Sequence, residues 1–332
     1  MAGAEAEVVQ VGAALFRQWL RDEFDVAVEA SSTDAAADTA SGLALSQLSL
    51  ARPSGPKMDA SVAVIPVYDA NADPTTLQSK AAWEERLVEV GVPPCVVWVP
   101  PLAEVPDDAG DQRVGAIAEA VAGLGQSERG EVSFPVVLRV ARDGDEGSYL
   151  NAFGGLSQHW ARFTNQVMGQ YRLDAAALHR LPDDPEETTK LIDLIVLIAN
   201  GVREVGKNAD IPAQDTWVVQ RVPGLDGPLV LAASPQLQPS EGRAVRKAVR
   251  AGMRGVQEAF STQSAARPAG TPEPLKAVVF VGMFRSIEEE NVAIALKGMD
   301  PMVFGSLDLA CVVADGRVKR LYGPPPGSPL AG

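Results

Sequence analysis

Two patterns of hydrophobic and polar positions divide the first part of the chain into predicted elements. Residues 5–24 carry apolar side chains at helical spacing, which predicts an amphipathic helix. Beyond residue 60, short continuous apolar runs of the kind found in buried strands alternate with helical patterns, at 61–69, 73–91, 93–101, 113–125 and 132–141. This order is typical of strands joined by helical crossovers. We therefore predict an α/β fold whose N-terminal lobe is a small, mainly parallel sheet of three-layer type.

After the polar turn at 141–148 the pattern becomes richer in helices. Apolar positions at helical spacing recur in 156–171 and 184–202, and strand-like runs follow at 216–222 and 228–234. Near the C-terminus, Asp315-Gly316 separates two strand-like stretches and is the strongest hairpin signal in the chain. These patterns predict a helix-rich α+β second lobe that ends in a β-hairpin.

The composition of the connecting segments gives the predicted domain limits. An acidic α/β lobe is expected over 1–147, and its stretch 29–58, rich in small residues, is expected to be a mobile linker or loop. The α+β lobe is expected over 148–322 and contains a basic helix at 241–260. The Pro- and Gly-rich end, 323–332, is expected to be a flexible tail.

Charge is distributed unevenly along the chain. The net charge is −14, and residues 1–150 account for all of it, with 24 acidic and 10 basic residues. The later part is neutral overall, yet its basic helix gathers five cations on one face. These cations, called the basic stripe below, are Arg243, Arg246, Lys247, Arg250 and Arg254. The opposite face of this helix is apolar.

Three readings of the basic stripe follow from its charge. It is a solvated face that latches against the acidic first lobe, a docking face for a protein partner or a second copy, or a contact for nucleic-acid phosphates. A protein of net charge −14 repels a polyanion, and no aromatic residues interleave the cations. Nucleic acid is therefore disfavoured, and we expect a protein partner or self-association.

Two sets of residues have the composition of a metal or catalytic site. Asp69 and Asp73 follow the first strand of the predicted sheet, where two carboxylates can hold Mg²⁺. A turn for Asp69 and a helix cap for Asp73 are the simpler explanation. Asp308, Asp315 and Lys319 surround the predicted hairpin. Two carboxylates that hold a metal and a lysine that stabilises developing charge suit phosphodiester hydrolysis. The hairpin turn is the simpler explanation of Asp315.

Histidine and cysteine favour structural roles. His159 and His179 lie on helix flanks, and the sequence assigns neither a carboxylate nor a nucleophile to them. Cys95 and Cys311 lie in apolar strand-like runs and are too few for a disulfide scaffold or a zinc cluster. We therefore predict no cofactor.

Localisation and function are predicted from what the chain lacks as well as from its charge. The N-terminus has no basic segment of a signal peptide, and the longest apolar run, 191–202, is shorter than the ~20 residues of a membrane span. We expect a cytoplasmic protein without membrane contact. The predicted function is a non-enzymatic interaction or assembly subunit of a multiprotein complex, docking through its basic helix and acidic lobe. The alternatives are a metal-dependent phosphodiester or phosphate-ester hydrolase and a nucleic-acid-associated factor.

Overall fold

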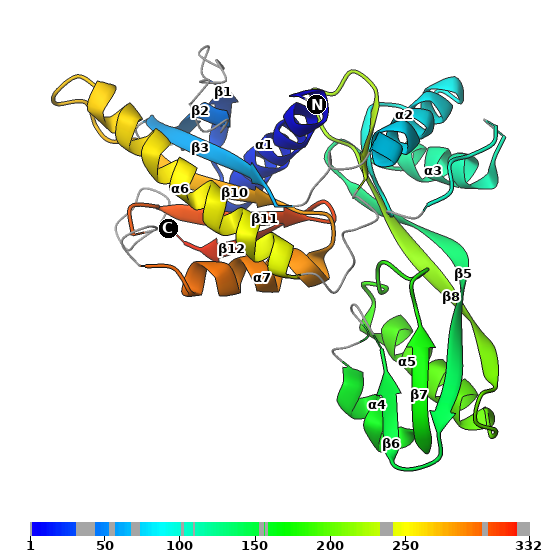
Figure 1. Cartoon of the computed structure of the whole chain (residues 1–332). Coiled ribbons are helices and arrows are strands. Elements are labelled where there is room, and N and C mark those ends of the chain that lie inside the picture. Colours follow the sequence, from blue (N-terminus) through cyan, green and yellow to red (C-terminus); the bar gives the residue numbers. More distant parts are fainter. Residues whose placement is uncertain are drawn as a thin grey trace.

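The structure is a computed structural model and has mixed α/β content (Figure 1). The described part of the chain forms two mixed sheets of six strands each. The structure describes residues 2–30, 44–52, 57–67, 74–100, 103–108, 110–152, 156, 159–232, 242–300 and 305–323. No helix among these residues is both long and apolar enough to cross a bilayer.

Sheet A joins strands from the two ends of the chain. Its order is β1-β2-β3-β10-β11-β12, where β3, β10 and β11 are mutually parallel and the outer pairings are antiparallel. The strands are β1 (Ala27–Ala30), β2 (Ala44–Ala51), β3 (Met58–Pro66), β10 (Leu275–Val281), β11 (Leu309–Ala314) and β12 (Arg317–Tyr322).

Helices cover both faces of sheet A. They are α1 (Ala2–Phe24) on one face and α6 (Gly242–Ala266) with α7 (Arg285–Lys297) on the other. Glycines allow the closest approach: a Cβ on Gly12 would lie 2.4 Å from Val281, and one on Gly252 would lie 2.7 Å from Ile65. Because both faces are covered, β3, β10 and β11 read as continuous apolar runs.

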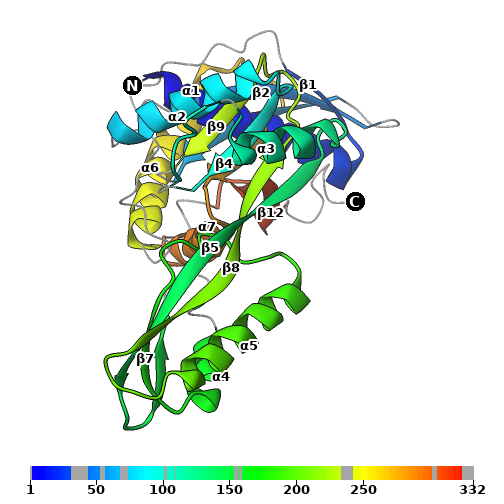
Figure 2. The same cartoon turned by 90° about the vertical axis from the view of Figure 1, so that its right-hand side faces the viewer.

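Sheet B is long and has two parts. Its order is β6-β7-β5-β8-β4-β9. The strands are β4 (Cys95–Val99), β5 (Arg129–Gly144), β6 (Ser148–Asn151), β7 (Gly169–Asp174), β8 (Asn208–Gln220) and β9 (Pro228–Ala232). Strands β5 and β8 pair antiparallel from Arg129↔Gln220 to Ala141↔Asn208 and connect the two parts as a twisted arm (Figure 2).

Each part of sheet B has its own helices and its own core. At one end, α2 (Pro74–Glu89) and α3 (Gln112–Ala122) cover β4, β9 and the adjoining ends of β5 and β8. We call this end, together with sheet A and its helices, the hub. At the other end, α4 (Trp160–Gln166) and α5 (Pro185–Gly201) pack on β6, β7 and the remaining ends of β5 and β8. We call this second end the distal module.

The predicted α/β class and the C-terminal hairpin are confirmed. Asp315 and Gly316 join β11 to β12 with φ angles of 51° and 72°, the left-handed values that a two-residue hairpin turn requires. The basic helix predicted over 241–260 is α6, which continues to Ala266.

The expected strand partners and the expected loop need correction. The predicted strands at 61–69, 93–101 and 132–141 do not form one parallel sheet: β3 belongs to sheet A, whereas β4 and β5 belong to sheet B, and β5 is antiparallel to its neighbours. Strand β4 is apolar throughout because Val96 and Trp98 pack toward sheet A while Cys95 and Val97 pack toward α2 and α3.

The predicted linker at 29–58 contains the strand β2, which buries three leucines at 45, 48 and 50. Residues 31–43 and 53–56 of that stretch lie outside the described residues, as does 324–332 of the predicted tail. The expected boundary at 147 falls in the turn between β5 and β6. Both sheets take strands from each side of it, because pairing partners lie far apart in the sequence.

Candidate functional site

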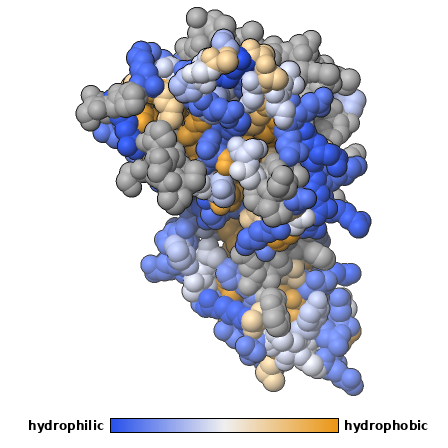
Figure 3. All heavy atoms as spheres, turned by 90° about the vertical axis from the view of Figure 1, so that its left-hand side faces the viewer, coloured by the Kyte–Doolittle hydropathy of each residue, from blue (hydrophilic) through white to orange (hydrophobic). Residues whose placement is uncertain are grey.

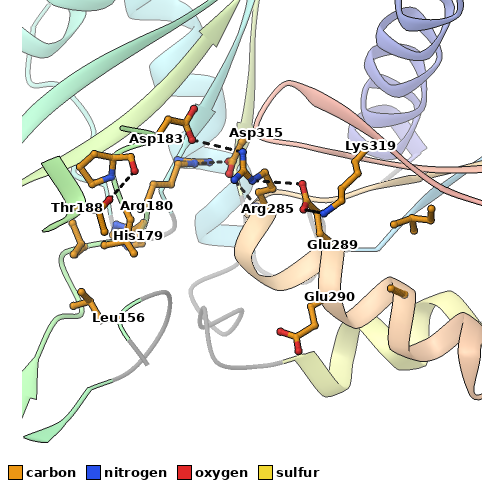
Figure 4. A pocket seen from close by; sticks show the side chains of 15 residues that line it. Leu156, His179, Arg180, Asp183, Thr188, Arg285, Glu289, Glu290, Asp315 and Lys319 are labelled. Atoms are coloured by element: carbon orange, nitrogen blue, oxygen red, sulfur yellow. Dashed lines mark hydrogen bonds and ion pairs between the residues drawn. The ribbon is translucent and has the colours of Figure 1, made fainter. Parts of the chain in front are cut away.

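A cavity of about 490 Å³ lies between the distal module and the hub (Figure 4). One wall is the segment that joins β7 to α5, and the facing wall is α7 with the β11–β12 hairpin. Its titratable lining residues are His179, Arg180, Asp183, Arg285, Glu289, Glu290, Asp315 and Lys319.

Arg180 links the distal module to the hub. Its Nε donates to Asp315 Oδ1 at 2.5 Å, and its two Nη atoms donate to the carbonyl oxygens of Trp98 (3.3 Å) and Met283 (3.1 Å). The guanidinium also lies 4.8 Å from the ring centroid of Phe284. Since Arg180 is only 7% exposed, one buried side chain joins β4, the β10–α7 connection and the hairpin turn.

A second group of charges surrounds Asp183 at the rim of the cavity. Its carboxylate pairs with Arg129 at 3.3 Å, with Arg285 at 3.8 Å and with Arg317. Burial alone raises the pKa of Asp183, but the hydrogen bond with Glu131 and the three arginines outweigh it and lower the pKa below its ordinary value. Asp183 is therefore a carboxylate anchored among cations, with little freedom to act as an acid.

The hub wall contains a fully buried carboxyl group, Glu288, which accepts hydrogen bonds from the backbone N–H groups of Met283 (3.0 Å) and Phe284 (2.8 Å). Burial raises the pKa of Glu288 to about 8. Gly282 makes room for it, because a Cβ there would lie 2.0 Å from Glu288 Cγ. This arrangement fixes the loop whose Met283 carbonyl receives Arg180.

His179 has an orienting carboxylate that the sequence did not indicate. Asp215, buried on β8, accepts hydrogen bonds from the backbone N–H groups of His179 (2.8 Å) and Arg180 (3.1 Å), and its Oδ2 lies 3.3 Å from His179 Nδ1. The imidazole also stacks near Phe284, at 6.4 Å between centroids. Because two of the three contacts are to backbone, Asp215 positions the segment that carries Arg180. His159 lies at the start of α4 and is not among the residues that line the cavity.

The predicted hydrolase residues do not form one site. Asp315 and Lys319 line the cavity, where Asp315 also accepts from the backbone N–H of Arg285 (3.0 Å) and Lys319 pairs with Glu289. Asp308 precedes the opposite end of β11 and accepts from Lys276 N at 2.8 Å. The strand separates the two aspartates by about 20 Å, at ~3.3 Å per residue. The trio predicted from sequence is therefore not assembled.

Metal ligation has no support in the described residues. Among them, no three or more His, Cys, Asp or Glu side chains come together as a metal site. The predicted pair, Asp69 and Asp73, lies outside the described residues. The two thiols, Cys95 and Cys311, are free and buried, as predicted.

The basic stripe lies on the solvent side of α6. The apolar face of this helix buries Val245, Val249, Met253, Val256 and Phe260 in the core of sheet A. On the other side Arg243, Lys247, Arg250 and Arg254 are exposed, whereas Arg246 is half-buried and donates to Asn291 of α7. In Figure 1 α6 crosses the hub in front of sheet A. Figure 3, viewed from the left-hand side of Figure 1, shows hydrophilic side chains interspersed with hydrophobic ones.

The cations of the basic stripe lack ion pairs with the described residues, unlike most of the other described arginines. No carboxylate of a described residue lies within 4.0 Å of any of its five cations. By contrast, twelve arginines elsewhere each lie within 4.0 Å of a carboxylate: Arg86, Arg113, Arg129, Arg139, Arg142, Arg162, Arg172, Arg180, Arg267, Arg285, Arg317 and Arg320. If the stripe held the first lobe in place within the same molecule, ion pairs between the two would be expected, and the described residues provide none.

Comparison with known proteins adds no assignment. A scan against protein-family models, a search of curated proteins and a search of solved structures each found no match. Function is therefore inferred from the sequence and the described residues alone.

Proposed function

We propose that the protein is a non-enzymatic assembly subunit that binds an acidic protein surface through the basic stripe of α6. The observation that carries this proposal is the contrast in pairing: the stripe exposes four cations without a carboxylate partner among the described residues, in a protein with excess negative charge. Exposed cations that are not engaged internally are available to a partner, and complementary charge both steers encounter and selects the partner.

The support beneath the stripe suits a docking surface. From Arg243 to Arg254 the helix advances about 17 Å, at 1.5 Å per residue, while five buried side chains hold its other face against sheet A. The cations are therefore presented from a rigid element, and binding does not have to order a loop. A partner with carboxylates at helical or strand spacing fits such a row better than a diffuse negative charge.

Two observations favour a cytoplasmic protein partner over the alternatives. The net charge of −14 opposes a long polyanion such as DNA, because charges elsewhere on the surface repel it within the screening length. Both cysteines are free thiols, which agrees with a reducing compartment such as the cytoplasm. Among the described residues, no assembled set supports the hydrolase alternative.

The test compares two double charge reversals with equal effect on net charge. Lys247→Glu/Arg254→Glu changes the stripe, and Arg203→Glu/Lys207→Glu changes exposed cations at the distal end of the arm. Binding of a fluorescent glutamate-rich peptide and of a fluorescent DNA duplex of equal charge is measured by anisotropy at ~0.1 M salt.

We expect the stripe variant to bind the peptide about tenfold more weakly than the wild type, because two attractive pairs become repulsive at ~0.2–1 kcal/mol each. The Arg203/Lys207 variant should bind nearly as the wild type does. Equal peptide binding by the two variants would refute the proposal, and stripe-dependent binding of the DNA alone would replace it with a nucleic-acid function.

A further inference from the structure

A second charged surface of the same chain complements the basic stripe. Five exposed carboxylates gather where the C-terminal end of α2 meets the segment that precedes α3. We call this surface the acidic patch; it comprises Glu85, Glu89, Glu104, Asp107 and Asp108.

Two arginines hold the acidic patch together from within. Arg86 donates to Glu89 (2.8 Å) and to the carbonyl oxygen of Asp107 (3.1 Å), which joins α2 to the following segment. Arg113 donates to the carbonyl oxygen of Glu104 at 3.0 Å, and it pairs with Asp111 at 2.8 Å. Five exposed carboxylates therefore surround two arginines, one of which is already paired with Asp111. The patch keeps a negative excess in a fixed arrangement.

The two surfaces also match in their apolar parts. Val88 and Val90, at the end of α2, are 59% and 38% exposed beside the carboxylates. On α6, the exposed side chains of Ala244 and Ala251 flank the cations. Small side chains allow a facing surface to approach closely, so the valines of the patch can pack on the alanines while carboxylates face cations.

From this match we infer that the acidic surface bound by the basic stripe is the acidic patch of a second copy of the chain. The inference rests on the proposed function and names its partner. Within one molecule the two surfaces do not face each other: α6 and the α2–α3 end lie on different sides of the hub (Figure 1). Since each copy contributes a different surface, the contact is head-to-tail, and repetition produces a ring or an open chain.

The test is a charge-swap complementation followed by sedimentation velocity at ~0.1 M salt, where the screening length is ~10 Å. The stripe variant Lys247→Glu/Arg254→Glu lowers the charge of the stripe from +5 to +1 and keeps the acidic patch intact. The patch variant Glu85→Lys/Asp108→Lys changes the summed charge of the five patch carboxylate positions from −5 to −1 and keeps the stripe intact. Arg203→Glu/Lys207→Glu serves as the net-charge control for the stripe variant, since both change the net charge by −4. All substituted side chains are exposed, and circular dichroism verifies that each variant is folded.

We expect the wild type and the control to sediment faster as their concentration rises. Each of the other two variants alone should sediment as a monomer, and an equimolar mixture of them should regain association. Salt at ~1 M, where the screening length is ~3 Å, should abolish association in every sample.

Two outcomes would overturn the inference: a wild type that stays monomeric at all concentrations, or association that persists in the stripe variant. A monomeric wild type whose stripe still binds the glutamate-rich peptide would refute self-association and leave the proposed function standing. If binding of the peptide did not depend on the stripe, the proposed function itself would be refuted. The two failures are therefore distinguishable.

Discussion

Replacement of Asp315 by Asn tests whether the ion pair with Arg180 holds the distal module against the hub. The substitution removes the negative charge and keeps nearly the same shape. Asn tolerates left-handed backbone, so the turn at φ 51° is preserved. The amide has one acceptor oxygen in place of two. Either Arg180 Nε or the backbone N–H of Arg285 then faces an NH₂ group and loses its partner.

The expected cost is large because both side chains are buried, at 5% exposure for Arg180 and 11% for Asp315. Two unit charges ~4 Å apart attract by ~4 kcal/mol at an effective dielectric constant of ~20. Removal of one partner also leaves the other charge buried without compensation, which typically costs ~3–5 kcal/mol. We therefore expect Asp315→Asn to lower the free energy of unfolding by about 3 kcal/mol.

Urea unfolding followed by tryptophan fluorescence measures this change. The matched control is Asp210→Asn, which breaks the pair with Arg139 where both side chains are more than half exposed; its cost should stay below ~1 kcal/mol. In the double variant Arg180→Met/Asp315→Asn the two effects should not add, because no unpaired charge remains. A loss below ~0.5 kcal/mol for Asp315→Asn, equal to that of the control, would refute this account of the contact.

Three further predictions concern buried groups. Between pH 4.5 and about 8 the folded state holds one more proton on Glu288 than the unfolded chain does. The free energy of unfolding should therefore fall as pH rises, by up to ~1.4 kcal/mol per pH unit. Glu288→Gln should flatten this slope, which urea titrations at several pH values measure. Gly282→Ala should destabilise the fold by ~1–3 kcal/mol, because the added Cβ would overlap Glu288. The control Gly201→Ala, whose Cβ would have no atom within 4 Å, should not destabilise it. Thermal unfolding of both variants measures the difference. Burial raises the pKa of Cys95 to about 12 and raises the pKa of Cys311 further. Both thiols should therefore react with a thiol reagent only after the protein is unfolded in denaturant.

Local patterns predicted the elements well, but not their partners. Asp315-Gly316 was sufficient for the hairpin because its turn geometry depends on two adjacent residues. The pairing of β3 with β10 joins segments more than 200 residues apart, and no local pattern encodes such a choice. The prediction that β3, β4 and β5 form one parallel sheet was wrong for a related reason. An apolar strand shows that both its faces are buried, but it does not show what buries them.

The cavity was even less accessible to sequence reasoning. The sequence indicates Asp315 and Lys319, but for a metal reaction that also needs Asp308, which lies at the other end of β11. The sequence does not indicate Arg180, since a single arginine in a polar segment gives no signal of burial. Its partners come from three separate segments. The basic stripe, by contrast, can be predicted from the sequence, because residues at helical spacing lie on the same face of a helix.

The distribution of sheet A between the two ends of the chain has a consequence for biosynthesis. Among the described residues, the core of the distal module takes its members from Val136 to Ala213, so it can assemble while synthesis continues. Strand β3 has to wait for β10, about 200 residues later, which corresponds to ~10–40 s at ~5–20 residues per second. During that interval one edge of an apolar strand is unpaired in the nascent chain. The slowest and most aggregation-prone stage of folding should therefore be the closure of sheet A around β3, at the end of translation.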